Sequence, residues 1–324
     1  MNILDTLQQK ARERGKHVVL PEGEDPRTIQ AARFLREKEI CRVTLLGRRA
    51  EVERLAAEQG FSLLAREIVD PAASEWTADF AHELFQLRKA KGMTLEQAMA
   101  AARGVMYFAA FMVRRRICDA SVGGALHTTG DVIRAGLHAL GMAPGIDTVS
   151  SSFLMVMPDG RLFTFADCAI VPQPDAKQLA SIALASAKTH RALTGTEPKV
   201  ALLSFSTKGS AKHADVDKVL EALALIRQAD PELSVDGELQ LDAAIVPKVA
   251  ASKAPGSAVA GGANVLVFPD LDAGNIGYKL TQRLAGAEAI GPTVQGLSAP
   301  FMDLSRGCSW SDIANVAAIA SLMA

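Results

Sequence analysis

The chain has 324 residues, of which 49% are hydrophobic and 22% are charged, and its formal net charge at pH 7 is −1. This balance argues against a disordered protein and against a strongly basic protein that gathers nucleic acid. The length suits two domains or one large one. The cysteines are widely scattered and form no C-x-x-C pair, which indicates neither a zinc site nor a disulfide framework and suits a reducing compartment; they are Cys41, Cys118, Cys168 and Cys308.

The N-terminal residues 1–16 mix charged and apolar side chains and lack the apolar core of a signal peptide. The longest apolar runs, 105–113 and 316–324, are too short to span a bilayer. We therefore expect a cytoplasmic protein without a membrane partner.

The first part of the chain alternates strand-like and helix-like segments. Strands are predicted at 17–20 and 42–47, helices at 27–37 and 49–59, and a third strand ends near 67–71. This alternation predicts an open parallel α/β sheet. The acidic turn Glu22-Gly23-Glu24-Asp25 follows the first strand, where ligands bind in such sheets, but by itself it is more typical of a solvated loop than of a metal site.

Two long helices are expected next, at 73–90 and 94–113. Thr94 is a candidate N-cap, with Gln97 at the capping-box position. The segment between the helices is basic and includes Arg88. Such a charge run usually forms a solvated surface.

A short strand then leads into a loop of small residues, Gly123 to His127. Thr128 or Thr129 is expected to cap a helix that runs to Leu140. Paired glycines and free amides at a helix N-terminus form a natural anion site, although many strand–helix turns look alike.

Turn-forming residues at 141–145 mark a candidate domain boundary. Residues 146–157 and 161–165, joined by the tight turn Pro158-Asp159-Gly160, predict an antiparallel strand pair. A helix is expected at 175–194 and a buried strand at 199–206. The following loop, 207–211, resembles a phosphate-binding loop but lacks the spacing of a nucleotide triphosphatase.

The α/β alternation continues with a helix at 216–229, a strand-like segment at 239–242 and a loop at 248–258. Residues 261–270 predict another strand, and the helix that follows carries Ile276, Leu280 and Leu284 on one face. Residues 291–300, rich in glycine and proline, are expected to form a connector.

The segment 300–312 is the most informative part of the chain. It places a hydroxyl, a guanidinium and a carboxylate close together before an apolar helix, 313–324. Ser309 or Ser311 is expected to be the N-cap, with Asp312 in the first turn. Arg306 would lie on the preceding loop, with its five donors available to a phosphate or a carboxylate.

Leu304-Ser305-Arg306-Gly307-Cys308-Ser309, with Asp312, resembles the C-terminal signature of the phosphate acetyltransferases. Segments 87–92, 119–134, 205–211 and 264–280 resemble further parts of the same family, in the same order. The resemblance implies two α/β domains of isocitrate dehydrogenase-like architecture with an interdomain cleft, residues 1–145 with 296–324 and residues 146–295. Gly123, Gly130 and Ala135 depart from the family pattern, which usually has serine, alanine and proline there.

The resemblance also implies an activity, acetyl-CoA + phosphate ⇌ acetyl phosphate + CoA, by direct transfer in a ternary complex. It implies that Asp312 takes the thiol proton, that Ser305 donates to the carbonyl oxygen, and that Arg306 binds phosphate. Substrate contacts are expected from Arg134, Arg88, His127, Thr128, Ser206, Lys208 and Cys308. His127 suits a structural role equally well, and no base is evident beside Cys308.

Three alternatives remain open at this stage. The first is an acyltransferase for a longer chain, such as a phosphate butyryltransferase. The second is a metal-dependent hydroxy-acid dehydrogenase of related architecture, which would need clustered aspartates and a nucleotide-binding loop. The third is a catalytically silent regulatory domain. We expect no metal and no tightly bound cofactor, coenzyme A as a substrate, small molecules rather than nucleic acid as partners, and a homodimer.

Overall fold

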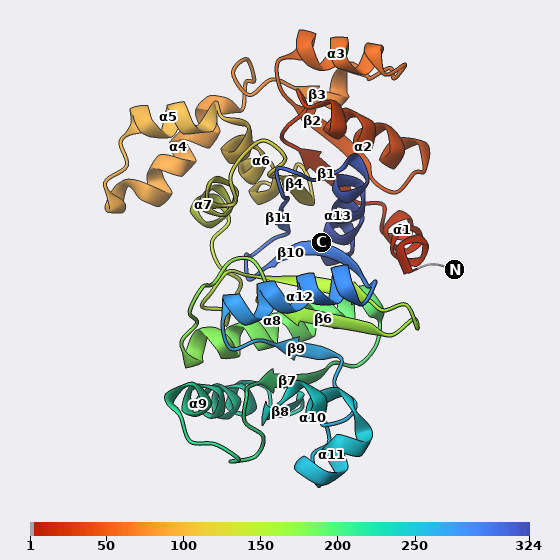
Figure 1. Cartoon of the computed structure of the whole chain (residues 1–324). Coiled ribbons are helices and arrows are strands. Elements are labelled where there is room, and N and C mark those ends of the chain that lie inside the picture. The colour runs from red at the N-terminus through yellow and green to blue at the C-terminus, as the bar shows by residue number, and fades with distance from the viewer. Residues whose placement is uncertain (1–2) are drawn as a thin grey trace. The chain divides into compact units, whose positions relative to one another are not determined.

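The computed structural model describes residues 3–324, which form two compact units (Figure 1). The first unit comprises the chain up to Ala143 together with Leu297–Ala324, and the second comprises Pro144–Gly296. Both contain a sheet covered by helices, so the expected α/β class with two sheets is confirmed. Among residues 3–324, no helix combines the length and the apolarity that crossing a bilayer requires.

The sheet of the first unit has five strands in the order β11-β4-β1-β2-β3. All four pairings are parallel, as the sequence predicts. The carboxyl ends of β1, β4 and β11 therefore lie side by side at one edge of the sheet, where ligands bind in such folds. The strands are β1 (His17–Leu20), β2 (Arg42–Leu46), β3 (Ile68–Val69), β4 (Ala120–Gly123) and β11 (Phe301–Asp303).

Helix α13 (Trp310–Met323) is the most deeply buried helix of this unit. Almost every residue from Ile313 to Leu322 is buried, because the helix is apolar all round and packs against β4, α1 and α2. The other helices of this unit are α1 (Ile3–Arg14), α2 (Pro26–Glu37), α3 (Arg49–Glu58), α4 (Thr77–Arg88), α5 (Leu95–Ala102), α6 (Val105–Arg114) and α7 (Thr129–Ala139), with 3-10 turns η1 (Ala65–Glu67) and η2 (Lys89–Lys91).

The single helix expected at 94–113 is wrong. The chain leaves α5 at Arg103 and restarts at α6, whose N-cap is Gly104 with extended backbone. Thr94 caps α5, and its capping box with Gln97 is confirmed by hydrogen bonds in both directions. The cap was predictable because it is local, whereas the break depends on where each helix packs.

The second unit has a six-stranded mixed sheet in the order β10-β5-β6-β9-β7-β8. The hairpin expected at Pro158-Asp159-Gly160 is confirmed, since β5 and β6 are antiparallel. β6, β9, β7 and β8 pair in parallel, and β10 pairs antiparallel with β5 at the edge. The strands are β5 (Ser150–Val156), β6 (Leu162–Ala166), β7 (Lys199–Leu203), β8 (Ser234–Leu239), β9 (Val265–Val267) and β10 (Glu288–Gln295).

Three expectations for this unit are wrong. The first half of the connector expected at 291–300 belongs to β10, which accommodates Gly291-Pro292 at an irregularity in its pairing with β5. The strand-like segment 239–242 is the end of β8 followed by a short helix, and the expected loop 248–258 begins with another helix. The helices are α8 (Ala176–Thr194), α9 (Ala214–Ala229), α10 (Leu241–Ile245), α11 (Pro247–Lys253) and α12 (Leu271–Leu284).

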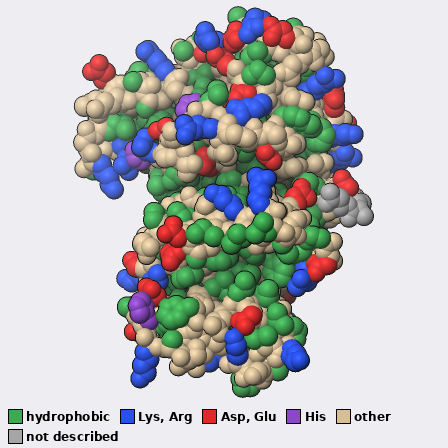
Figure 2. All heavy atoms as spheres, in the orientation of Figure 1, with side chains coloured by type: hydrophobic (Ala, Val, Ile, Leu, Met, Phe, Trp, Pro, Cys, Tyr) green, Lys and Arg blue, Asp and Glu red, His purple; other side chains and the backbone are tan. Residues whose placement is uncertain are grey.

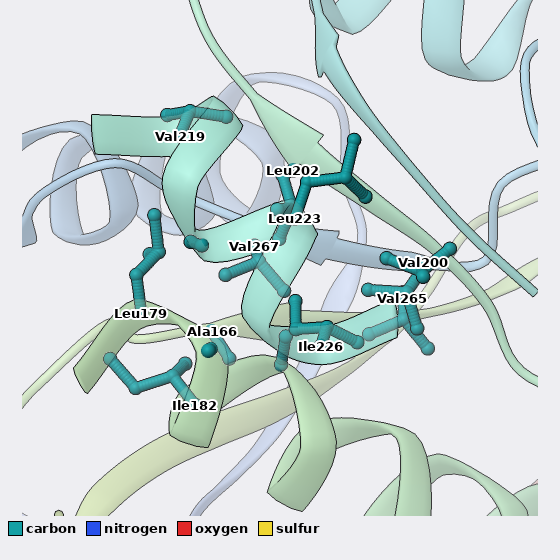
Figure 3. Packing of buried hydrophobic residues seen from close by; sticks show 14 of the residues in the cluster. Ala166, Leu179, Ile182, Val200, Leu202, Val219, Leu223, Ile226, Val265 and Val267 are labelled. Atoms are coloured by element: carbon teal, nitrogen blue, oxygen red, sulfur yellow. The ribbon is translucent and has the colours of Figure 1, made fainter. Parts of the chain in front are cut away.

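The core of the second unit lies on both faces of its sheet. On one face, Leu179 and Ile182 of α8 and Ile226 of α9 pack on side chains of β7 and β9 (Figure 3). A second buried cluster includes Phe165 and Phe268, whose rings meet edge to face. Burial on both faces explains why these strands are apolar throughout rather than alternating.

Candidate active site

Three loops meet at the carboxyl edge of the first unit's sheet. They follow β1, β4 and β11, which are neighbours in the sheet. The loop after β4 carries His127 and Thr128, and the loop after β11 carries Ser305, Arg306 and Cys308. Parallel pairing thus brings together predicted site residues that are far apart in the sequence.

Glu22, directly after β1, holds the loop after β4 in place. Its carboxylate accepts hydrogen bonds from the backbone amides of four successive residues, Gly124 to His127, at 2.7–3.0 Å. The His127 ring donates a fifth bond from Nδ1, at 2.8 Å. Burial alone would raise the pKa of Glu22, but these hydrogen bonds hold it below its ordinary value. Glu22 is therefore an ionised, buried group.

The expectation of a solvated acidic turn is wrong at two of its three carboxylates. Glu22 and Asp25 are each 4% exposed, while Glu24 forms an ion pair with Arg48. Asp25 caps α2 by accepting from the amide of Arg27. The sequence placed this turn correctly at the strand end, but it did not indicate which carboxylates point inward.

Arg27 connects the loop after β4 with the loop after β11. Its Nη1 donates to the carbonyl oxygens of Arg306 and Cys308, both at 2.9 Å, and its Nη2 donates to that of Ala125 at 3.0 Å. The Asp25 carboxylate holds the guanidinium in place at 2.6 Å. Sequence analysis did not identify Arg27, because its partners lie up to 281 positions away.

Gly124 allows the two loops to touch. Its φ is +110°, and a Cβ at this position would lie 2.5 Å from Asp303 Oδ1 and 2.7 Å from the Leu304 amide nitrogen. A side chain here would therefore force the loops apart.

The C-terminal loop ends in the expected helix cap. Ser309 is the N-cap of α13, and its backbone amide completes a capping box by donating to Asp312 Oδ2 at 2.8 Å. Asp312 is exposed, and it uses Oδ2 for both bonds to Ser309. Ser305 is exposed, and its Oγ accepts from the Gly307 amide.

The Arg306 side chain is exposed, and no side chain among residues 3–324 pairs with its guanidinium. Arg27 donates to the backbone carbonyl oxygen of Arg306 and so fixes the loop that carries this unpaired guanidinium. Cys308 is buried, and burial raises the pKa of its thiol to about 11. A thiol with this pKa remains protonated at neutral pH, which argues against a nucleophilic role.

Helix α7 begins at this same edge. Thr128 is its N-cap, and its hydroxyl also donates to Asp131. Asp131 in turn pairs with Arg134 at 2.9 Å, and the Arg134 side chain is 58% exposed. The first amides of α7 and the exposed Arg134 are groups that bind anions.

Arg88 lies in the same electrostatic environment as Arg134, although 46 positions separate them. Burial, and then the charges of Arg88 and Arg134, lower the pKa of His138 on α7. The hydroxyl of Tyr107 on α6 forms a hydrogen bond of 2.8 Å with Nδ1 of His138. Arg88 of the basic segment and Arg134 thus act on the same histidine, and together these cations favour an anionic ligand.

The comparisons with known proteins decide the family. Residues 2–321 match the family model described as phosphate acetyl/butaryl transferase. The chain belongs to this family. It is 48% identical over 329 residues to a phosphate acetyltransferase of Thermoanaerobacterium thermosaccharolyticum, with 100% of each chain covered. The resemblance seen in the sequence is therefore confirmed.

Two solved structures of phosphotransacetylases are similar to this member of the transferase family. One from Streptococcus pyogenes is 42% identical with a TM-score of 0.95, covering 99% of this chain and 98% of that one. One from Staphylococcus aureus is 44% identical with a TM-score of 0.91, covering 99% and 97%. The matched residues, 99% of this chain in both cases, extend through both units.

Ser206 and Lys208 of this transferase lie in the second unit, in the loop after β7. Ser206 is fully buried and donates to Glu238 at 2.9 Å. Lys208 pairs with Asp236 and also donates to the carbonyl of Gly237. Both side chains thus stabilise their own loop, and their expected contact with substrate stays a prediction.

No group of three or more His, Cys, Asp or Glu side chains within residues 3–324 is arranged to hold a metal ion. The acidic groups near the loops are instead engaged by protein donors. Glu22 accepts five hydrogen bonds, and Asp303 accepts one from Thr129 at 2.6 Å. Asp303, like Glu22 and Arg27, was not identified from the sequence.

Proposed function

We propose that this protein catalyses the reversible transfer of an acetyl group between acetyl phosphate and coenzyme A. The observation that carries the proposal is the arrangement of Ser305, Arg306 and Asp312 on one anchored loop, beside the start of α7, in a chain 48% identical to a phosphate acetyltransferase along its whole length. Both substrates carry phosphates, and exposed arginines with a helix N-terminus are suited to bind them.

Each residue of the C-terminal loop has a role in this mechanism. The thiol of CoA has a pKa of ~8.5 and is mostly protonated at neutral pH, so a base is needed. Asp312 takes that proton through Oδ1, the oxygen that makes no bond to Ser309. Thiolate sulfur then attacks the acetyl carbonyl, and the Ser305 hydroxyl donates to the oxygen on which charge develops.

The arginines bind the phosphate. Arg306 offers two parallel donors, its carbonyl is fixed by Arg27, and its guanidinium pairs with no side chain among residues 3–324. Arg134 and Arg88 attract the phosphates of the substrates to the start of α7. His127, Thr128 and the loop with Ser206 and Lys208 are further substrate contacts in this proposal, and Cys308 is a buried neighbour rather than a nucleophile.

The proposed enzyme is a cytoplasmic homodimer that uses coenzyme A as a substrate and holds no cofactor tightly. Support for the dimer comes from α12, which exposes Ile276, Leu280 and Leu284 at 57, 52 and 82%. These residues are spaced four apart and form one stripe, and Figure 2 shows hydrophobic side chains gathered over this helix. An exposed stripe of this kind marks an interaction surface, here for a second copy of the chain.

One assay tests the function and its nearest alternative. Purified protein is incubated with CoA and acetyl phosphate, and thioester formation is followed by absorbance, with butyryl phosphate in parallel. We expect rapid thioester formation with acetyl phosphate and slower formation with butyryl phosphate. A preference for butyryl phosphate would identify a longer-chain acyltransferase, and inactivity with both would favour the regulatory domain.

A further inference from the structure

The His127 ring has one nitrogen fixed and the other free. Nδ1 lies 2.8 Å from Oε1 of Glu22, and an ionised carboxylate only accepts, so Nδ1 carries the hydrogen of this bond. Within residues 3–324, Nε2 has no hydrogen-bond partner, and the side chain is 37% exposed. A buried carboxylate therefore orients an imidazole whose other nitrogen faces solvent.

This free nitrogen belongs to the phosphate end of the proposed site. His127 directly precedes Thr128, the N-cap of α7, and the first amides of this helix suit an anion. Its loop contacts Asp303 and Leu304 at Gly124 and is connected through Arg27 to Arg306. Asp312, the proposed base, follows the same C-terminal loop in the chain, in the first turn of α13.

The reaction needs an acid as well as a base. When sulfur attacks acetyl phosphate, the bond between the acetyl carbon and the bridging oxygen breaks. The phosphate then leaves with three negative charges unless its bridging oxygen receives a proton. Asp312 removes a proton at sulfur and cannot supply one at this oxygen in the same step. The residues assigned so far leave this second proton without a donor.

We propose that His127 is the general acid that protonates the leaving phosphate through Nε2, and that Glu22 is its positioning residue. This inference rests on the function proposed above. The step balances: the thiol proton passes to Asp312, the carbon–sulfur bond forms, the carbon–oxygen bond breaks, and the Nε2 proton passes to the oxygen, which leaves as hydrogen phosphate. In the reverse direction, neutral His127 removes that proton as phosphate attacks acetyl-CoA.

The charges around His127 favour its protonated form. Its hydrogen bond to Glu22 and, more weakly, the charge of Asp131 on α7 raise its pKa above the ordinary value, against the effect of burial. Asp303 on β11 adds a further carboxyl group nearby, while Arg27 on α2 is neutralised by Asp25. Asp131 is itself paired with Arg134, while the guanidinium of Arg306 on the C-terminal loop pairs with no side chain among residues 3–324. A raised pKa means that the acid is present at neutral pH and is lost as pH increases.

His127→Asn is the most direct test, because the asparagine amide can still donate to Glu22 and so preserve the loop. We expect turnover with acetyl phosphate and CoA to fall about 10²–10⁴-fold, the usual contribution of a general acid. The apparent affinity for acetyl phosphate should change little. Wild-type turnover should decline at alkaline pH as His127 loses its proton, and that decline should be absent from the variant.

Glu22 and a second histidine provide the controls. Glu22→Gln should lower turnover and return the pKa of His127, followed by NMR of ring-labelled protein, toward 6.5. His82→Asn, at an exposed position on α4 whose ring contacts only Gln86, should leave turnover and its pH profile unchanged. Imidazole added to His127→Ala should restore part of the turnover.

The outcomes separate the inference from the function on which it rests. If the wild-type protein shows no CoA-dependent use of acetyl phosphate, both the proposed function and the role of His127 are wrong. An active wild type, together with a folded His127→Asn variant that retains the alkaline decline, would overturn the role of His127 alone. So would an NMR titration in which the pKa of His127 lies below the ordinary histidine value of ~6.5, a measurement that requires no activity.

Discussion

The hydroxyl of Thr129, in the first turn of α7, donates a 2.6 Å hydrogen bond to Oδ2 of Asp303 at the end of β11. Asp303 is 4% exposed, and its other oxygen has no partner within residues 3–324. Burial raises the pKa of Asp303 to about 6, although the bond from Thr129 opposes this. The carboxyl group of Asp303 thus joins the start of α7 to the end of β11, and its ionisation costs free energy in the folded state.

Asp303→Asn should stabilise the protein at pH 7.5 and change its stability little at pH 4. The folded state holds this proton more tightly than the unfolded chain, whose aspartates have a pKa of ~3.9. The free energy of unfolding therefore falls as pH rises from about 4 to about 6, by roughly 1–3 kcal/mol. Asparagine removes this loss. Urea unfolding at both pH values measures the stability of the variant relative to wild type. A variant less stable than wild type at pH 7.5 would contradict the prediction.

The sequence predicted the first unit well because its signals are local and its strands are buried in parallel. Helix starts after Thr94 and Ser309 follow from capping residues, and both are confirmed. β10 was missed because Gly291-Pro292 lies in its middle and favours a turn locally, while its pairing with β5 is a contact between distant segments. Tertiary pairing outweighed local propensity there.

The residues of the candidate site also differ in whether their partners are near or distant in the sequence. The capping box of Ser309 and Asp312 was predictable because three positions separate the two residues. Glu22 and Arg27 were not, because their partners lie about 100 and 280 positions away. Their residue types did not indicate these roles, since an acidic turn with an arginine is common on protein surfaces. Long-range hydrogen bonds, rather than motifs, reveal these two residues.

Arg27→Ala should lower both stability and turnover. The variant leaves three carbonyl oxygens and the buried Asp25 without their donor. We expect a loss of about 1–3 kcal/mol in the free energy of unfolding. A displaced Arg306 should lower turnover by on the order of 10²-fold. Arg48→Ala is the matched control, because its ion pair with Glu24 is mostly exposed and should contribute little. Equal effects of the two substitutions would contradict this role.

Gly123→Ser should destabilise the protein, although serine is the residue that the family usually has there. A Cβ at Gly123 would lie 2.7 Å from Pro21 Cγ and 2.8 Å from Met106 Cε. Such overpacking typically costs about 1–3 kcal/mol. In a double-mutant cycle, Met106→Ala should reduce the cost of the serine. Thermal midpoints of the four proteins check this; additive effects would mean that Met106 is not the obstacle.

Arg306→Ala should impair turnover far more than folding. The side chain is exposed and unpaired within residues 3–324, so its loss should shift stability by only about ±0.5 kcal/mol. Losing a donor that stabilises transition-state charge costs on the order of 10²–10³-fold in rate. Lysine should restore only part of it, because it keeps the charge but lacks the two parallel donors. Steady-state kinetics on folded variants check this, and near-normal turnover of the alanine variant would exclude Arg306 from the site.

Asp312→Asn distinguishes catalysis from capping at a single position. Asparagine can still accept from Ser309, so a residue that only caps α13 would lose about 1 kcal/mol of stability or less and keep its turnover. A base for the thiol would instead lose turnover sharply, with little change in the apparent affinity for CoA.

The pH dependence of this defect makes the test specific for proton removal from sulfur. As pH approaches the thiol pKa of ~8.5, solvent supplies thiolate without a base. The ratio of wild-type to Asp312→Asn turnover should therefore shrink toward pH 8.5, whereas the defect of His127→Asn should be largest at low pH, where the wild-type acid is protonated. Profiles of both variants, measured with thermal midpoints on the same preparations, separate the two proton transfers. A ratio for Asp312→Asn that stays constant with pH would mean that this carboxylate does not act on the thiol.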